Sequence, residues 1–317
     1  MSINRISAGG IVGVDVSKEW LDLSVAGEAG GERIGNNEDE IAAFLKRARP
    51  ALVAFEPTGG YERVLREALR AQGILFTRVH PNDVIAFRKA RGIKAKTDRI
   101  DARLIADFAA EASARRGLRP AICGDETLRE LAARRRQIAQ ALQAERCRLA
   151  MAAAPAVRTS LQRVIDTLIA SREEIEGEIA AHIAADTETA KLAALLQGIK
   201  GIGPVTAMTL IADMPELGLL SSKEIAALAG LAPLTRQSGK SSYRAHTAHG
   251  RSAVRAALFN AARATISHAS PFRDFYDRLV IQNQRPGKVA LTAVMRKILV
   301  TANAVARDRQ PWKAQTT

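Results

Sequence analysis

Apolar and polar residues alternate over short runs in the first eighty residues of the chain. From Gly10 to Glu28, an apolar β-branched run, a short polar break and a second alternating run together predict a β-hairpin. A third short strand is expected near 32–34. Amphipathic helices then alternate with apolar strands, which indicates an α/β sheet that opens with a hairpin. The helices are predicted at 36–49 and 61–72, and the strands at 51–58 and 74–79.

Long amphipathic helices replace this pattern from Thr97 onward. Thr97 stands where it can cap the helix that follows it. Two further helices are predicted at 125–151 and from about 160 to 185, with Pro155 interrupting the chain between them. The pair resembles a helical hairpin, and its short heptad-like stripes fit equally a scaffold or a dimerisation coiled coil.

The last third of the chain begins with two apolar helical segments joined by a glycine-rich turn at 201–203. This arrangement resembles a helix-hairpin-helix motif, in which the turn brings backbone amides close to a DNA phosphate. A purely structural bend would give the same pattern. Residues 231–250 are polar, basic and rich in hydroxyls, so they are predicted to form an exposed loop. Helices are expected again at 251–268 and 288–307.

These patterns predict a chain of three parts. Residues 1–120 form an α/β domain whose order of elements fits an RNase H-like fold. Residues 121–190 form the helical hairpin or coiled coil, and residues 191–317 form a mostly α-helical domain that carries the helix-hairpin-helix-like turn. With 317 residues, the chain is long enough for two domains of ordinary size, each with its own core.

Composition indicates a polyanionic partner. The chain has 47 Lys and Arg residues against 33 Asp and Glu residues, which gives a formal net charge of +14. This balance favours phosphate contacts with nucleic acid. A basic protein from a high-GC genome, in which Arg replaces Lys, is the alternative explanation of the charge. No apolar run suggests a membrane span and no signal peptide is recognised, so the protein is expected in the cytoplasm. Cys123 and Cys147 are not spaced as metal ligands and are expected to be reduced thiols.

Four acidic residues stand out by their positions. Asp15 lies inside the first apolar strand and Glu56 at the end of another, while Asp98 and Asp101 are three residues apart on one helix face. A carboxylate within an apolar strand is costly to bury unless a partner such as a divalent cation neutralises it. Two cations held by shared carboxylates would activate one phosphodiester oxygen and stabilise the leaving one. Taken singly, each acid also fits a plain role as a turn cap, an exposed strand end or a helix N-terminus.

Motifs along most of the chain resemble those of a known family. GVDVSK at 13–18, FEPTGGY at 55–61 and KTDRIDARLIA at 96–106 resemble the DEDD transposases of the insertion-sequence family known as "one-ten". The later segments GIKGIGPVTAMTLIADM, GLAPLTRQSGK and HGRSAVRAALFNAA match that family as well. The resemblance runs from about Gly10 to Arg307, and its motifs occur in the expected order. Each motif alone is weakly specific, whereas the set is highly specific.

The resemblance implies an insertion-sequence transposase with an N-terminal domain similar to the RuvC Holliday-junction resolvase. In such a domain, Asp15, Glu56, Asp98 and Asp101 would be the catalytic quartet that binds Mg²⁺, with one or two ions in the site. The expected activity is cleavage and rejoining of DNA strands.

The resemblance also implies a nucleophilic serine in the C-terminal domain. Ser238, in the segment RQSGK, aligns best with it, and Ser241 and Ser242 are close enough to stay alternatives. Its hydroxyl would attack a DNA phosphodiester and form a covalent phosphoserine before the strand is rejoined. The family is expected to complete this site between protomers, in a dimer or tetramer.

The implied partners are the double-stranded DNA of the element's ends and of its target, together with a non-coding guide RNA encoded beside the gene. Base pairing by that RNA would choose the sequence, and the protein would hold phosphates. Solvated surface charge would account for several of the candidate contacts equally well. Those candidates are Lys94, Lys96, Arg99, Arg103, Gly201, Gly203, Lys240 and Arg251.

Other functions compete with a transposase. A junction nuclease would use the four carboxylates and water alone, and a non-catalytic nucleic-acid-binding protein would use none of them. Actin-like ATPases share the opening strand but need further Gly-rich phosphate loops, which the sequence lacks. The three tyrosines show no tyrosine-recombinase arrangement. A zinc site at His246 and His249 is disfavoured, because two histidines in a loop more often form hydrogen bonds or contact phosphates.

Overall fold

The computed structural model describes residues 9–93, 97–116, 124–238, 241–247 and 250–313. Within these ranges, only the backbone is described at 234–238 and 241–246 and at two arginines of one helix, Arg99 and Arg116. The chain divides into two compact units, one ending at residue 121 and the other beginning at residue 122. Each unit has its own hydrophobic core, so each is described by itself below.

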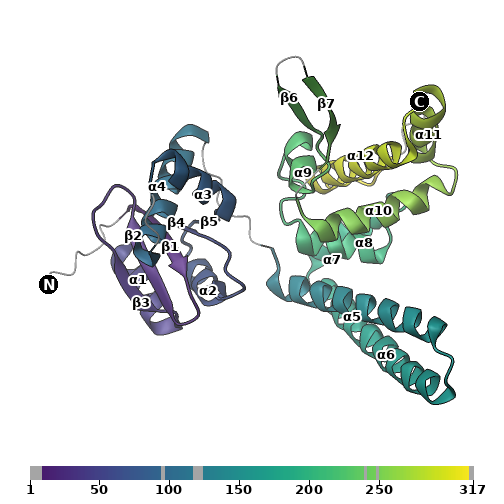
Figure 1. The fold of residues 1–317 in the computed structure, drawn as a ribbon, viewed down its shortest axis with the longest axis horizontal. Helices are drawn as coiled ribbons and strands as arrows, with labels where there is room; N and C mark the ends of the chain where they lie inside the picture. Colours follow the sequence, from purple (N-terminus) through teal and green to yellow (C-terminus); the bar gives the residue numbers. More distant parts are fainter. Residues whose placement is uncertain (1–8, 94–96, 117–123, 239–240, 248–249, 314–317) are drawn as a thin grey trace. The chain divides into compact units, whose positions relative to one another are not determined.

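A five-stranded mixed sheet forms the centre of the first unit (Figure 1). The strand order is β3-β2-β1-β4-β5, with β1 to β3 antiparallel and β1, β4 and β5 parallel. This is the order of an RNase H-like sheet, so the sequence-based prediction of the fold of this unit is confirmed. The strands are β1 (Ile11–Val16), β2 (Trp20–Val25), β3 (Glu32–Gly35), β4 (Leu52–Phe55) and β5 (Phe76–Arg78).

Four helices accompany this sheet. The first was predicted with its buried face, and its N-terminus is capped by the side chain of Asn37, which accepts from the N–H of Glu40. The third was not predicted; it begins with Pro81 at its first turn and His80 as its N-cap. The helices are α1 (Glu38–Ala48), α2 (Arg63–Ala71), α3 (Pro81–Ala90) and α4 (Asp98–Arg116).

Strand β1 and helix α4 approach each other so closely that only glycine fits between them. A Cβ atom on Gly13 would lie 2.2 Å from the carbonyl oxygen of Ala102 and 2.3 Å from the nitrogen of Ala106. Both are backbone atoms, so neither can move aside without moving the helix. Gly13 therefore sets the distance between the strand that carries Asp15 and the helix that carries Asp98 and Asp101.

Helices build most of the second unit. Its first two pack as an antiparallel hairpin, as predicted, but the second begins at Pro155 rather than near residue 160 (Figure 1). Proline is well tolerated in the first turn of a helix, where its missing N–H is not needed. Cys147 on the first of them is a free, exposed thiol. The helices are α5 (Glu126–Met151), α6 (Pro155–Ala185), α7 (Thr187–Gln197), α8 (Pro204–Asp213), α9 (Ser222–Leu228), α10 (Ser252–Ile266), α11 (Pro271–Asp277) and α12 (Gly287–Asp308), with a π-helical turn η1 (Arg278–Gln282).

Helix α12 lies in the core of the second unit. By length and composition alone it is apolar enough to cross a membrane, contrary to the expectation from the sequence that no segment would be. In the structure Val294, Ile298 and Leu299 of this helix are fully buried in the core cluster of the unit. Arg296 and Lys297 stand in the middle of the same helix. These features are those of a core helix with one polar face.

Residues 231–250 do not form the exposed loop that the sequence predicts. They contain two antiparallel strands, β6 (Leu234–Ser238) and β7 (Ser241–His246), in which Ser238 pairs with Ser241. These strands are rich in Ser, Thr, Arg and Gln and lack apolar alternation, which is why the sequence pattern indicated a loop. Two residues separate the paired serines, which is the connection length of a tight hairpin.

Candidate active site

Asp15 lies near the end of β1, and several carboxylates surround it. It pairs in register with Asp22 on the neighbouring strand β2. Burial raises the pKa of Asp15 to about 6, and the nearby charges of Asp101, Asp98 and Glu56 add to this increase. The fold therefore brings the four carboxylates singled out from the sequence into one neighbourhood.

Glu56 follows directly after β4, which runs parallel to β1, so Glu56 comes to the same edge of the sheet as Asp15. Glu62, an almost fully buried carboxylate, shapes the loop behind it. It accepts hydrogen bonds from the N–H groups of Thr58 (3.2 Å) and Gly60 (3.0 Å). We infer that Glu62 fixes the course of the chain after Glu56, a role that the sequence pattern did not reveal.

Asp98 and Asp101 both stand in the first turn of α4. The Thr97 hydroxyl accepts from the N–H of Ile100 at 3.3 Å, which confirms the predicted cap. Asp98 is mostly exposed and Asp101 is largely buried. An N-terminal turn favours negative charge, so this position helps to hold two carboxylates side by side.

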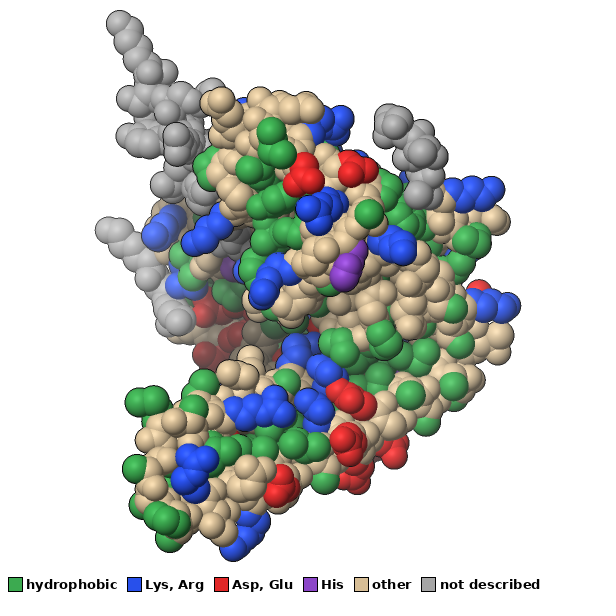
Figure 2. Space-filling view, turned by 90° about the vertical axis from the view of Figure 1, so that its right-hand side faces the viewer, with side chains coloured by type: hydrophobic (Ala, Val, Ile, Leu, Met, Phe, Trp, Pro, Cys, Tyr) green, Lys and Arg blue, Asp and Glu red, His purple; other side chains and the backbone are tan. Residues whose placement is uncertain are grey.

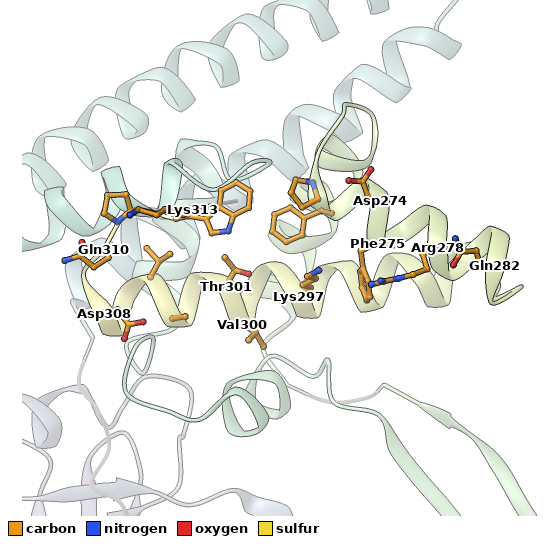
Figure 3. A pocket seen from close by; sticks show the side chains of 16 residues that line it. Asp274, Phe275, Arg278, Gln282, Lys297, Val300, Thr301, Asp308, Gln310 and Lys313 are labelled. Carbon is orange, nitrogen blue, oxygen red and sulfur yellow. The ribbon is translucent and has the colours of Figure 1, made fainter. Parts of the chain in front are cut away.

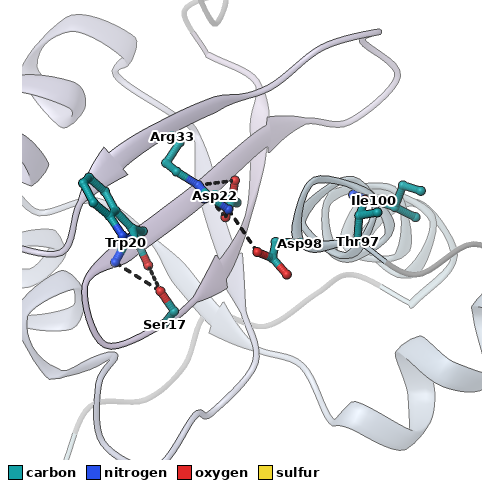
Figure 4. Close-up of polar contacts among 7 residues, drawn as sticks. All are labelled: Ser17, Trp20, Asp22, Arg33, Thr97, Asp98 and Ile100. Atoms are coloured by element: carbon teal, nitrogen blue, oxygen red, sulfur yellow. Dashed lines mark hydrogen bonds and ion pairs between the residues drawn. The ribbon is translucent and has the colours of Figure 1, made fainter.

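Arg33 on β3 connects the carboxylate of Asp98 to a buried one on the sheet (Figure 4). Its guanidinium donates three hydrogen bonds to Asp22, two from Nε at 3.1 and 3.2 Å and one from Nη2 at 2.7 Å, and one at 3.0 Å to Asp98. Asp22 is only 4% exposed, so Arg33 neutralises a carboxylate that water hardly reaches. Neither Asp22 nor Arg33 was among the residues predicted to form the site.

Arg88 on α3 pairs with the other acid of this first turn, Asp101, and its Nη2 lies 3.2 Å from Oδ1 of that carboxylate. The same oxygen, Oδ1, is buried and accepts no hydrogen bond, so the contact with Arg88 is an ion pair alone. A buried acceptor without a hydrogen bond is unfavourable, and a cation that binds it would remove that cost. Both acids in the first turn of α4 thus contact an arginine in this structure.

The donor set fits a hard divalent cation, although the carboxylates do not form a finished metal site. Among the described residues, no group of three or more His, Cys, Asp or Glu side chains is arranged to hold an ion. Burial and the neighbouring carboxylates raise the pKa of Asp15, and Oδ1 of Asp101 accepts no hydrogen bond, so a bound cation would relieve both costs. Carboxylate oxygens alone favour Mg²⁺, Mn²⁺ or Ca²⁺ over zinc. Binding would require Asp98 and Asp101 to exchange their arginine contacts for the ion.

The candidate serines lie on the β6–β7 hairpin. Ser238 ends β6, Ser241 begins β7 opposite it, and Ser242 pairs with Gln237. Their side chains are outside the described residues, as is that of His246, and His249 is outside them entirely. The backbone therefore places all three serines within one short hairpin.

The two glycines of the turn between α7 and α8 differ in their surroundings. Gly201 has a φ of 90°, and a Cβ atom there would lie 2.6 Å from the carbonyl oxygen of Ala261 on α10. A Cβ atom on Gly203, the N-cap of α8, would meet nothing within 4 Å. Gly201 is thus required for packing, and Gly203 alone leaves open space where a ligand would bind.

Arg251 is used inside the second unit. Its guanidinium makes two hydrogen bonds to Glu216, at 2.5 and 2.6 Å, and one of 2.8 Å to the carbonyl of Asp213. This pairing gives Arg251 a structural role. Arg103 on α4 is mostly exposed, with only a distant contact of 3.9 Å to Asp107. The predicted phosphate contacts outside the described residues are Lys94, Lys96, Lys240 and the side chain of Arg99.

Arginine side chains also gather along the α5–α6 hairpin, beside hydrophobic side chains (Figure 2). At least some of this charge is compensated within the hairpin. Arg135 and Arg172 share Glu176, at 2.5 and 3.8 Å. The hairpin therefore has internal ion pairs as well as a basic face.

The strand order and the acidic edge define the first unit as an RNase H-like domain, a class that generally uses divalent metal ions. Comparison with protein families then identifies the chain. A model of DEDD transposases of the IS110 type matches residues 12–152, and the model of the Transposase IS116/IS110/IS902 family matches residues 193–277. Together the two models span most of the chain. The chain belongs to this family and is a DNA transposase or recombinase.

Curated relatives agree with this assignment. The chain is 29% identical over 261 residues to the pilin gene-inverting proteins of Moraxella lacunata and Moraxella bovis, covering 81% of this chain and 80% of each relative. Among solved structures, Thermus thermophilus RuvC in complex with a Holliday junction substrate is 18% identical, with a TM-score of 0.29. That match covers 36% of this chain and 99% of RuvC.

Proposed function

We propose that this transposase cleaves and rejoins DNA strands with a divalent cation, Mg²⁺, bound by Asp15, Glu56, Asp98 and Asp101. The observation that carries the proposal is the position of Asp15. Its carboxylate is partly buried beside three other carboxylates, and its pKa is raised to about 6. Such an arrangement costs stability unless a cation binds, and costly charge of this kind is typical of functional sites.

The residues of the chain would prepare this site in three ways. Gly13 lets α4 approach β1, which brings the four carboxylates together. Asp22 anchors Arg33, so that the arginine can hold Asp98 near its binding position. Arg88 does the same for Asp101. A bound divalent ion would supply Lewis acidity at the phosphodiester and stabilise charge on the leaving oxygen.

We infer that Ser238 is the nucleophile of the rejoining chemistry. Its Oγ would attack the phosphorus of a DNA phosphodiester and lose its proton, while the bond to one DNA oxygen breaks and that oxygen leaves as a hydroxyl. The hydroxyl of another strand would then attack the phosphoserine and release the serine. The position of Ser238 at the end of β6 and the family resemblance of RQSGK support this role over those of Ser241 and Ser242.

The partners proposed for the reaction are DNA of the element's ends and target, a guide RNA and further copies of the chain. The net charge of +14 and the open turn at Gly203 support contact with phosphates, to which Lys94, Lys96, Lys240 and Arg103 would contribute. The α5–α6 hairpin is the proposed dimerisation element. The matched relatives are named for inverting a pilin gene, so rearrangement of DNA is the activity we propose for this chain too.

The test is a strand-cleavage assay with purified protein, Mg²⁺, RNA from the flanking region and labelled DNA of the element's ends. Asp15→Asn should lower cleavage at least 100-fold while nucleic-acid binding stays within about twofold, because the carboxylate holds the ion and not the DNA. Asp39→Asn, an exposed acid in the first turn of α1, is the matched control and should leave cleavage unchanged. Loss of DNA binding in Asp15→Asn would instead assign the residue a structural role.

The nucleophile is tested in the same reaction by denaturing electrophoresis. Wild type should leave a protein–DNA adduct that resists denaturation, and Ser238→Ala should not. An adduct that survives in Ser238→Ala but disappears in Ser241→Ala or Ser242→Ala would move the nucleophile within the hairpin. Cleavage that depends on Asp15 but never yields an adduct would make the protein a nuclease that uses water.

A further inference from the structure

A cavity of about 800 Å³ lies in the second unit, and none of the residues discussed as catalytic lines it. Helices α11 and α12, the turn η1 and the segment 310–313 form its walls. Phe275, Arg278 and Lys297 gather at one end of it, and Gln310 and Lys313 lie toward the other (Figure 3). Aromatic, cationic and amide side chains are thus concentrated in one place, in a chain that is only 4% aromatic.

Two cations meet on one aromatic ring at the end of this cavity. Lys297 Nζ lies 4.6 Å from the centroid of the Phe275 ring, and the guanidinium carbon of Arg278 lies 5.5 Å from the same centroid. The negative face of an aromatic ring attracts cations, which holds each of these charges beside the ring. Within the described part of the chain, neither of them forms an ion pair. Two adjacent, uncompensated positive charges favour an anionic ligand.

Only part of the acidic lining opposes these cations. Asp308 lines the cavity but is paired with Arg307 at 2.8 Å. Asp274 is the other acid of the lining and is exposed. Lys313 adds a third cation near the opposite end. Positive charge therefore exceeds negative charge along the cavity.

The segment that builds the cavity is also strongly basic. Residues 251–317 contain twelve Lys and Arg residues against three Asp residues and no Glu, which accounts for +9 of the net charge of +14. A polyanion is the ligand whose charge matches such a surface. An isolated small anion would not need so extended a basic segment.

Aromatic side chains give the cavity a surface on which a base can stack. The indole of Trp312 lies parallel to the ring of Phe272, with centroids 5.5 Å apart and planes 18° apart. Phe272 is buried and Trp312 only partly so, which leaves part of the indole accessible from the cavity side. Sites that combine a cationic track with aromatic platforms are typical of single-stranded nucleic-acid binding.

We propose that this cavity binds an unpaired stretch of a nucleic-acid strand. Its phosphates contact Lys297 and Arg278, and a base stacks near Trp312. The proposal rests on the proposed function only in taking nucleic acid as the partner, and it assigns a binding site separate from the carboxylates. A guide RNA loop and a separated DNA strand share this chemistry, and the test below distinguishes them.

The variant Lys297→Gln/Arg278→Gln tests the phosphate contacts. Labelled oligo(dT), oligo(rU) and duplex DNA of equal length are titrated with full-length protein without divalent metal, and fluorescence anisotropy is measured. Single-strand affinity should fall about tenfold. The slope of log K against log salt should decrease by about 1.4, because each neutralised phosphate contributes about 0.7 on a single strand. Lys223→Gln/Lys46→Gln removes the same charge from exposed positions outside the cavity and should change little.

Trp312 supplies a second and independent signal. The chain has two tryptophans, and Trp20 is about half exposed, so Trp20→Phe leaves Trp312 as the sole reporter in a protein that should still fold. Binding of a single strand should quench its fluorescence, and Lys297→Gln/Arg278→Gln should abolish this quenching at the same concentration. Preference for oligo(rU) would identify RNA as the ligand, and preference for oligo(dT) would identify a DNA strand.

Three results would overturn the site: unchanged single-strand affinity in the double variant, no quenching of Trp312, or an equal loss of single-strand and duplex binding. The last result would indicate a general basic surface. Asp15→Asn should bind and quench like wild type, because the carboxylates take no part in the cavity. A failure of cleavage chemistry is therefore distinguishable from a failure of this proposal.

Discussion

The two ends of the chain use charge in opposite ways. Residues 1–121 hold twenty Lys and Arg residues against sixteen Asp and Glu residues, and arginines contact acids around Asp15. Residues 251–317 hold twelve cations against three acids, and the cations of the cavity stay unpaired among the described residues. Charge in the first unit is positioned by backbone packing at one edge of a sheet. Most of the charge in the last segment stands on exposed side chains. The first arrangement suits chemistry at one point, and the second suits binding of an extended polyanion.

The largest expected effect comes from a change in the backbone packing of the first unit alone. Gly13→Ala places a methyl group 2.2 Å from the carbonyl oxygen of Ala102, so α4 must move away from β1. The free energy of unfolding of the first unit should fall by about 3 kcal/mol or more, as overpacked cores do. In a Trp312→Phe background, Trp20 is the sole tryptophan, and chemical denaturation followed by its fluorescence reports on that unit.

Gly177→Ala is the matched control in the second unit. Gly177 lies within α6, and a Cβ atom there would meet nothing within 4 Å. Alanine in an exposed helix should raise stability by roughly 0.5–1 kcal/mol. If Gly13→Ala unfolds no more easily than wild type, the carboxylates do not depend on this contact.

The second prediction asks whether the second unit depends on a similarly close packing. Gly201→Ala should cost about 2 kcal/mol, because the residue has a φ of 90° and its new methyl group would lie 2.6 Å from the carbonyl oxygen of Ala261. Gly203→Ala should be nearly neutral, since its φ is −88° and its surroundings are open. Thermal unfolding of the two variants measures the difference, and equal losses would contradict the distinct roles assigned to the two glycines.

Periodicity in the sequence predicted those parts of the fold that have a regular apolar face. The amphipathic helix predicted at 36–49 forms as α1, and its apolar residues are all buried: Ile41, Phe44, Leu45 and Ala48. The β6–β7 hairpin was missed because its strands are polar, and α3 because its helical pattern is short and weak. Pro155 was predicted to interrupt the chain between two helices, because proline breaks a helix interior. In the structure it is the first residue of α6, a position where proline is equally favoured.

The sequence predicted the acids of the candidate site but not the residues that contact them. An acid such as Asp15 is conspicuous in an apolar strand, so its position alone draws attention. Nothing in the sequence distinguishes Arg33 and Arg88 from the other arginines. Only the fold brings them to Asp98 and Asp101. Asp22 offered a signal, as an acid in the alternating strand WLDLSV that becomes almost fully buried.

The third prediction concerns that buried acid. Arg33→Met removes all three hydrogen bonds from this arginine to Asp22 and leaves the carboxylate buried without them, which should cost about 1–2 kcal/mol. Arg115→Met breaks an exposed pair with Glu111 and should cost less than about 0.5 kcal/mol. Adding Asp22→Asn to Arg33→Met should recover part of the loss in urea denaturation. Equal costs for the two single variants would show that Arg33 does not neutralise a buried charge.

The smallest expected effect tests the cost of charge on Asp15 itself. Its pKa of about 6 in the folded protein exceeds the ordinary value of 3.8, so the unfolded chain releases this proton first as pH rises. Without metal, stability from this group is fully present below about pH 4 and is lost as pH rises through about 6. The loss should be on the order of 1 kcal/mol, because the carboxylate is only partly buried.

Asp15→Asn should lack this loss, so it should be more stable than wild type at pH 8 and no more stable at pH 4. Added Mg²⁺ at pH 8 should stabilise wild type and not the variant. A wild type whose stability is independent of both pH and Mg²⁺ across this range would show that the carboxylates around Asp15 repel one another too weakly to require a cation.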